Sequence, residues 1–166
     1  MRHLRLNALL AATAFCGLAT PAVAGSTSGS LSATATINAN CTVSTSPVAF
    51  GTVDPLSGSN VDNSGAVTVT CTNGTAWTAA GGVGSGTGAT FATRVMTSGS
   101  NTLNYSLYTN SGRSTVWGDG TASTATVGAT GNGTAQTITI YGRVPAGQGS
   151  AAPGSYSDTV SVTVTY

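Results

Sequence analysis

The sequence predicts an all-β protein built as a β-sandwich, and three observations support this. Short stretches rich in Val, Thr, Ile and Tyr alternate apolar and polar residues with a period of two. Turn signals such as Asn73-Gly74, Gly131-Asn132-Gly133 and Pro153-Gly154 separate these stretches. Helix-forming residues are scarce, and Lys and Glu are absent from all 166 residues. Many short strands at close spacing are typical of a sandwich rather than of a propeller or a repeat array.

Residues 1–24 are predicted to be a secretory signal peptide. A basic start precedes an apolar stretch, residues 9–18, that is too short to span a membrane as a helix. Ala22-Val23-Ala24 is a small-x-small cleavage signal, so the mature protein would begin at Gly25. The alternative, a lipoprotein acylated at Cys16, lacks the leucine expected three positions earlier.

The first half of the mature chain carries four expected strands. Residues 31–37 alternate Leu, Ala, Ala and Ile with Ser and Thr, and residues 41–50 form a second stretch that Pro47 interrupts, because proline lacks an amide hydrogen. Residues 66–72 form a clear strand with two valines and a cysteine on one face, and residues 77–80 form a weaker one. A flexible glycine-rich loop, residues 81–88, follows.

The second half carries five more expected strands, in which β-branched and aromatic residues are dense. They are residues 91–96, 103–108, 115–117, 136–144 and 156–166. The last one places Val160, Val162, Val164 and Tyr166 on one face and Ser or Thr on the other. A sheet edge with this apolar face and no charge to protect it invites pairing with another chain.

Residue composition excludes several classes of function. The mature chain has three arginines and four aspartates, a net charge of −1, and the only histidine lies in the signal peptide. A Ser-His-Asp triad is therefore impossible, and no basic footprint for nucleic acid exists. Two of the four aspartates could pair as general acid and base, but each aspartate lies in a turn-like context. We assign no catalytic residue, no metal site and no cofactor, since no spaced Asp/Asn loop for calcium is present either.

Two cysteines remain after cleavage, Cys41 and Cys71, and an even count in an exported chain favours one disulfide. The alternatives are a free thiol pair or half of a metal site, which would lack a second ligand pair. Trp77 and Trp117 have two interpretations: a sugar-binding platform, or core residues, which we favour. Arg94 and Arg143 lie within strand patterns, where arginine usually faces outward, sits at an edge or forms a buried ion pair.

Four segments resemble the spore coat protein U domain family, whose members are the subunits of archaic chaperone–usher pili. They are "CTVSTSPVAFGTVDP" from Cys41, "GAVTVTCTNGT" from Gly65, "LNYSLYTNSGRSTVWGDG" from Leu103 and "ITIYGRVPAGQGSAAPGSYSDTVSVTVTY" from Ile138. The resemblance spans nearly the whole mature chain in order. Its most specific part is "YGRVPAGQ" followed by "GSYSDTVSVTVTY".

This resemblance implies an incomplete immunoglobulin-like β-sandwich of the pilin type that lacks its final strand. The missing strand would leave a hydrophobic groove, completed by a donor strand from another chain. The implied partners are a periplasmic pilus chaperone, an outer-membrane usher and neighbouring identical or related subunits. The implied division is a leader and donor strand at residues 25–40 and the pilin domain at residues 41–166.

The sequence contains candidates for both halves of this interaction. The donor would be residues 31–37, which present Leu31, Ala33, Ala35 and Ile37 to the groove of a neighbour by strand addition. The acceptor edge would be the last strand, with Val160, Val162, Val164 and Tyr166. An alternative for residues 31–37 is an ordinary first strand within its own domain.

We therefore expect a structural, non-enzymatic subunit that is exported through the periplasm and polymerises on the cell surface for adhesion and biofilm formation. Head-to-tail contacts of this kind do not close, so they build filaments. Two alternatives are a spore or cell coat protein and a secreted carbohydrate-binding module that uses Trp77 or Trp117.

Overall fold

The computed structural model describes residues 21–166, so residues 1–20 of the predicted signal peptide lie outside the described residues. The chain divides into two units, residues 1–35 and Thr36–Tyr166. In the described part of the first unit, residues 21–35 form no strand and are exposed. Residues 36–40 form no strand either, so the alternative in which residues 31–37 are the first strand of their own sandwich is wrong for this structure.

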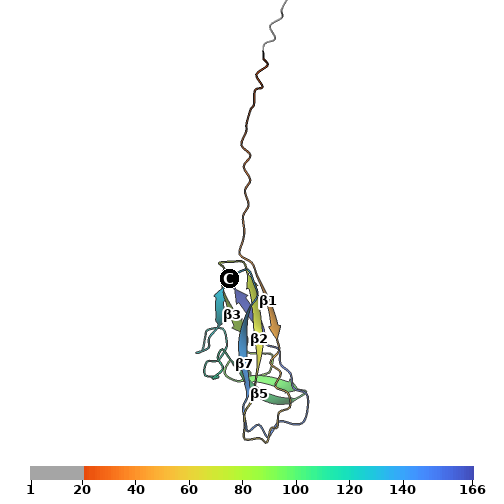
Figure 1. Cartoon of the computed structure of the whole chain (residues 1–166). Helices are drawn as coiled ribbons and strands as arrows, with labels where there is room; N and C mark the ends of the chain where they lie inside the picture. The colour runs from red at the N-terminus through yellow and green to blue at the C-terminus, as the bar shows by residue number, and fades with distance from the viewer. Residues whose placement is uncertain (1–20) are drawn as a thin grey trace, which may run out of the picture. The chain divides into compact units, whose positions relative to one another are not determined.

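The second unit consists of two antiparallel sheets (Figure 1), and the described residues contain no helix. A five-stranded sheet has the order β1-β2-β7-β5-β4, and a three-stranded sheet has the order β6-β3-β8. The all-β, two-sheet class predicted from the sequence is thus confirmed. The strands are β1 (Cys41–Ser46), β2 (Val61–Cys71), β3 (Ala76–Gly81), β4 (Arg94–Ser98), β5 (Asn101–Tyr108), β6 (Val127–Thr130), β7 (Gln136–Val144) and β8 (Val162–Thr165).

Strict alternation along the central strands places the core between the sheets. In β2, Val67 and Val69 are buried while Thr68 and Thr70 lie on the opposite face, and β7 pairs with β2 so that Ile138 lies opposite Val67. Leucine and tyrosine residues of β5 and both tryptophans complete this core. Each buried aliphatic side chain contributes about 1.5–3 kcal/mol, so the alternating pattern is sufficient to specify which face is inside.

Both tryptophans are core residues, which confirms the interpretation that the sequence favours. Trp77 and Trp117 are 2% exposed. The Trp117 indole N–H donates to the carbonyl of Ala79 (3.1 Å), and that of Trp77 donates to the Gln136 side chain (3.1 Å). Their rings therefore do not form a surface platform for sugars, which removes the feature on which the carbohydrate-binding alternative depended.

Cys41 and Cys71 form a disulfide, which confirms the predicted pairing. They are directly opposite each other in the β1–β2 ladder, and within the described part of the chain β2 is the one strand that pairs with β1. The disulfide therefore fastens an edge strand that has a single neighbour in its sheet. Most of β1 is exposed, so burial of side chains contributes little to holding this strand in place. The disulfide therefore contributes a larger share of its stability than it would in a central strand.

Replacing Cys71 with serine is expected to lower the free energy of unfolding by about 3–4 kcal/mol, on the chain-entropy estimate for a closed loop of 30 residues. Urea unfolding of the oxidised protein and of the Cys71→Ser variant measures this difference. A matched Thr70→Ser variant, on the opposite face of β2, should differ from the parent by much less. Equal midpoints for parent and Cys71→Ser would contradict a stabilising role for the disulfide.

Several segments differ from the sequence-based prediction: residues 31–37 form no strand, the strand predicted for residues 41–50 ends at Ser46, and the one predicted for residues 91–96 is β4, Arg94–Ser98. Residues 115–117 form isolated bridges, Tyr108–Val116 and Trp117–Ala125, rather than a strand. The short strand β6 was not predicted, because its residues, VGAT, are small and give little alternation. The final strand, predicted for residues 156–166, is regular only over Val162–Thr165, for a reason that the groove geometry explains below.

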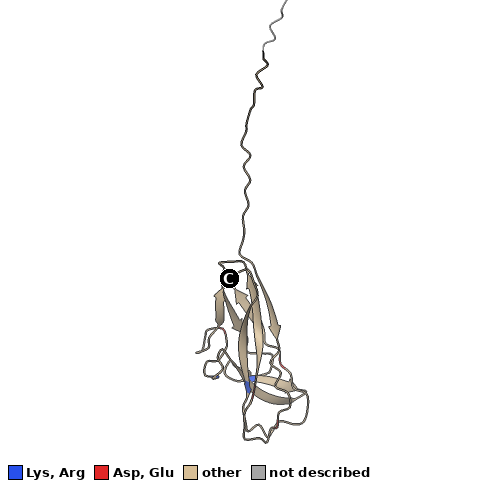
Figure 2. Cartoon of the chain, viewed as in Figure 1, with Lys and Arg blue, Asp and Glu red and all other residues tan. Residues whose placement is uncertain are grey.

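No helix among the described residues is long and apolar enough to cross a membrane. Charged side chains are sparse throughout the described chain, and Figure 2 shows most of each sheet without them. Among the described residues, no three His, Cys, Asp or Glu side chains gather where they could hold a metal ion.

Candidate functional site

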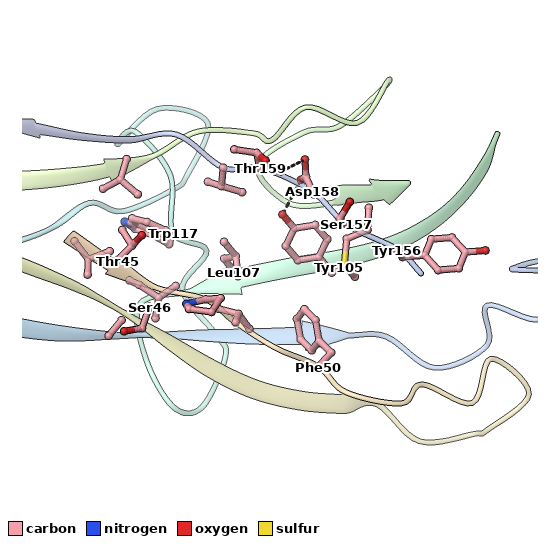
Figure 3. Close-up of a pocket in the computed structure, with 18 residues that line it drawn as sticks. Thr45, Ser46, Phe50, Tyr105, Leu107, Trp117, Tyr156, Ser157, Asp158 and Thr159 are labelled. Carbon is pink, nitrogen blue, oxygen red and sulfur yellow. Dashed lines mark hydrogen bonds between the residues drawn. The ribbon is translucent and has the colours of Figure 1, made fainter. Parts of the chain in front are cut away.

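The candidate site is a groove between the two sheets, which we call the open groove; it has a volume of about 400 Å³. One bank is the end of β1 and the segment after it, and the other is the chain that leads into β8 (Figure 3). The chain leaves the β1 ladder at Pro47, which cannot donate a ladder hydrogen bond. The lining residues are Thr45, Ser46, Pro47, Val48, Phe50, Ala66, Val67, Met96, Tyr105, Leu107, Trp117, Ile140, Tyr156, Ser157, Asp158, Thr159, Val160 and Val162.

Buried side chains of β5 and β7 form much of the floor of the open groove. Tyr105 and Leu107 of β5 and Ile140 of β7 are 2–5% exposed, and Tyr105 meets Phe50 edge-on with 6.0 Å between ring centroids. Phe50 and Val48 can approach β7 because residue 142 is glycine: a Cβ there would lie 2.6–3.1 Å from their side-chain atoms. The residues of the floor are thus core residues of the sandwich that also line the open groove.

Apolar residues on the β8 bank are only half covered. Val160, Val162 and Val164 are half-buried and pack against the core, whereas the intervening Ser161 and Thr163 are exposed. The alternation predicted from the sequence is present at these valines. Tyr166, predicted to share their face, is 55% exposed and lies outside β8, and neither it nor Val164 lines the open groove.

Both banks of the open groove present sheet edges with one strand neighbour. Among the strands of residues 21–166, β1 pairs with β2 alone, and β8 pairs with β3 alone. Along β8, the backbone amide and carbonyl groups of the even-numbered residues face the free edge. The Gly82 amide donates to the Ser161 carbonyl (2.8 Å), so the backbone carbonyl of Ser161 points toward β3. The Gly81 amide donates to the Gly118 carbonyl (3.2 Å) and not to Val162.

Backbone groups alternate sides along an antiparallel strand. With Ser161 and Thr163 directed toward β3, the amide and carbonyl groups of Val160, Val162 and Val164 point to the free edge. Unpaired main-chain groups next to a half-covered apolar row are the features that accept an added strand. The open groove can therefore bind an extended segment by backbone hydrogen bonds and by burial of alternate side chains.

Among the described residues, the one charged side chain that lines the open groove is Asp158. Its Oδ1 accepts hydrogen bonds from the amide and hydroxyl of Ser85 and from the Thr159 amide, each at 2.7 Å, and its Oδ2 accepts from the Tyr105 hydroxyl at 2.7 Å. Burial alone would raise the pKa of Asp158, but these hydrogen bonds outweigh it and hold the pKa below its ordinary value. Burial and the bond to Asp158 raise the pKa of Tyr105 above its ordinary range.

The predicted turn roles of the aspartates are right for two of them and wrong for the other two. Asp54 and Asp119 accept hydrogen bonds from amides two residues ahead, as turn residues do. Asp62 instead lies in β2 and forms ion pairs with Arg143 (2.8 Å) and Arg113 (3.2 Å). Asp158 lies in an extended segment and binds residues far away in sequence.

Arg94 is fully buried, next to the open groove, without an ion pair among the described residues. Its guanidinium donates to the carbonyls of Gly82 (2.9 Å), Phe91 (3.0 Å) and Trp117 (2.7 Å). Burial lowers its pKa, which the nearby Tyr105 and Asp158 partly offset. One expectation for Arg94 was a buried ion pair. Its guanidinium instead binds three backbone carbonyls.

The stability of the domain is expected to be nearly constant between pH 5 and 9 and to fall steeply below about pH 4. No His, Lys or Glu lies in residues 25–166. The pKa of Asp62, lowered chiefly by the hydrogen bond from Arg143, and that of Asp158 are depressed in the folded state. Their contribution is therefore present above the unfolded pKa and is lost as the pH falls through the folded values.

Urea midpoints measured from pH 2.5 to 9 check this profile. Asp158→Asn should flatten part of the acid limb, because it removes one of the depressed carboxyl groups. A midpoint that changes markedly between pH 6 and 8 would contradict it.

The sequence model of the spore coat protein U domain matches residues 27–163, which is most of the chain. The chain belongs to the spore coat protein U domain family. No curated protein sequence matches it.

One solved structure with a similar fold comes from a pilus assembly system. It is a chain of the CsuC–CsuE chaperone–tip adhesion subunit pre-assembly complex from the archaic chaperone–usher Csu pili of Acinetobacter baumannii. The TM-score is 0.57 with 24% sequence identity, over 79% of this spore coat protein U domain chain and 40% of that chain. The present chain thus spans 40% of the length of the protein it matches, and the likeness is one of fold.

Proposed function

We propose that this chain is a structural subunit of an archaic chaperone–usher pilus, and that a β-strand from another chain fills the open groove. The observation that carries the proposal is the groove itself: half-covered valines beside a sheet edge whose amide and carbonyl groups face outward. Membership of the spore coat protein U domain family and the fold shared with a chaperone–subunit complex support the same function.

Residues 31–37 are the proposed donor. Leu31 and Ile37 are 96% and 85% exposed, and neither belongs to a strand. Large side chains already line the floor of the groove, which suits a donor with alanine at its two central positions, Ala33 and Ala35. Burial of Leu31 and Ile37 would contribute about 1.5–3 kcal/mol each, and each ladder hydrogen bond about 0.5–1.5 kcal/mol.

The proposed partners follow from this pairing. A periplasmic chaperone strand would occupy the groove before assembly, an outer-membrane usher would exchange it, and the residue 31–37 segment of the next subunit would replace it. The product would be an extracellular fibre for adhesion and biofilm formation, reached by export with cleavage of residues 1–24. The scarcity of charge fits a sheet edge that is always covered.

A double substitution in the leader, Leu31→Ser with Ile37→Ser, tests the donor assignment. We expect loss of fibres and of high-mass oligomers, because the two side chains with most apolar area no longer gain burial. The matched control is Ser32→Ala with Thr36→Ala on the other face of the segment, which should still assemble. Electron microscopy of the producing cells measures fibre length.

Fibres of normal length from the Leu31→Ser/Ile37→Ser variant would contradict the donor assignment. A shell around the cell, lost in the same variant, would favour the coat-protein alternative, with the same pairing chemistry but a different assembly.

A further inference from the structure

The β8 bank of the open groove is built from two sheets. At Ser157 the chain pairs with Thr97 of β4, through two hydrogen bonds of 2.9 and 3.1 Å, and so extends the five-stranded sheet. From Ser161 onward it pairs with Gly82 and then with β3, and so belongs to the three-stranded sheet. Residues 158–160 lie between these two ladders without a backbone partner in either, which is why the regular strand begins only at Val162.

The Asp158 carboxylate forms hydrogen bonds in the stretch, residues 158–160, that has no backbone partner in either ladder. It binds the amide and hydroxyl of Ser85 in the loop between β3 and β4, and the hydroxyl of Tyr105 on the groove floor. The bank is therefore attached to a loop and to the core at the point where ladder hydrogen bonds are missing. Hydrogen bonds to a charged acceptor are stronger than neutral ones, so this attachment is suited to replace ladder pairing.

Glycines in the loop permit this close approach. A Cβ at Gly84 would lie 2.1 Å from Asp158 Oδ2, and one at Gly82 would lie 2.5 Å from the Ser161 hydroxyl. Gly84 also has a φ of +95°, a backbone conformation that favours glycine. The glycine-rich loop, predicted to be flexible from its composition, is thus packed against the bank by residue-specific contacts.

We propose that Asp158, with Ser85 and Tyr105, is a positioning element that aligns residues 157–160 with Val162–Thr165, so that a donor strand meets one continuous edge across two sheets. The inference rests on the proposed function, because it assumes that a strand binds this edge. The titratable or charged side chains that interact with Asp158 are Tyr105, by a hydrogen bond, and Arg94, by its charge. The element holds its geometry at every pH at which Asp158 is ionised. Without it, the donor would be held by Val162 and Val164 but would lose its pairing at Val160.

A labelled peptide with the sequence of residues 30–38 tests this inference. The acceptor is the full chain carrying Leu31→Ser and Ile37→Ser, so that its own leader does not compete. Added to this parent, Asp158→Ala and Gly84→Ala are expected to weaken peptide binding about tenfold, mainly through faster dissociation. The matched control is Gly88→Ala: Gly88 also has a positive φ (+78°), but a Cβ there would contact nothing within 4 Å. Its affinity should stay close to that of the parent.

Residue-resolved hydrogen exchange separates positioning from general loss of stability. In the peptide-bound parent, the amides of Val160, Val162 and Val164 should all be protected. In Asp158→Ala the Val160 amide should lose protection while the Val164 amide keeps it; a variant that is merely less stable would lose both. If Asp158→Ala does not fold, Ser85→Ala removes only the hydroxyl donor from an exposed residue and should speed dissociation about threefold.

Parent-like affinity and parent-like Val160 protection in Asp158→Ala or Ser85→Ala would overturn the positioning role while leaving the proposed function intact. A parent chain that does not bind the peptide at all would overturn the proposed function, and the inference with it.

Discussion

Replacing Arg94 with methionine is expected to lower the free energy of unfolding by about 3–5 kcal/mol. The guanidinium is fully buried, and its removal leaves three backbone carbonyls, of Gly82, Phe91 and Trp117, without a donor. These carbonyls belong to both ends of the β3–β4 loop and to the groove floor. One side chain thus fixes three segments that no ladder connects.

Arg94→Lys should recover little of this loss, because one ammonium cannot reproduce the planar fork of donors. Arg143→Met is the matched control: this side chain is one-third exposed and its ion pair with Asp62 is worth at most about 1 kcal/mol. Urea unfolding followed by the fluorescence of the two buried tryptophans measures all three variants. A smaller loss for Arg94→Met than for Arg143→Met would contradict this account of Arg94.

Replacing Val162 with proline is expected to abolish strand addition while the subunit still folds. The Val162 amide faces the free edge, so proline there removes a donor that the sandwich itself does not use, and its ring obstructs a neighbouring strand. Proline is tolerated on edge strands in this orientation. Fibre length and binding of the residue 30–38 peptide should both fall to background.

Thr163→Pro provides the contrast, because its amide faces β3 and its loss breaks the ladder to Ala80. That variant should be poorly folded, as judged by tryptophan fluorescence, whereas Val162→Pro should retain the parent spectrum. Normal peptide binding by Val162→Pro would show that the free edge of β8 does not carry the pairing.

Local patterns were enough to predict the strands that bury one face. In β5, β7 and the second half of β2 the alternation of apolar and polar residues is regular; β7 has the predicted bounds, β5 begins two residues before the predicted start, and β2 begins five residues before it. The Cys41–Cys71 pairing also followed from a count of cysteines. The alternation depends on residues that are neighbours in sequence, and two cysteines can pair in one way. Both features can therefore be read from the sequence.

Features that depend on distant contacts were missed. The partners of Asp158 lie 53 and 73 residues away, so its neighbours in sequence suggested a turn instead. The predicted continuous strand over residues 156–166 is divided because the chain passes from β4 to β3, a change that alternation alone does not encode. Arg94 likewise had no visible sequence signal, since its three acceptors are backbone carbonyls brought together by the fold.

Cysteine cross-linking between two populations of the full chain tests the central claim most directly. One population carries Val162→Cys in the groove, and the other carries Ala33→Cys or Ala35→Cys in the leader. We predict a disulfide between two different chains from at least one of these pairs, seen as a dimer on a non-reducing gel, and much less from Thr34→Cys on the opposite face of the donor. Absence of an inter-chain cross-link at both alanine positions, with each chain folded, would contradict the claim that the groove is filled by a strand from another subunit.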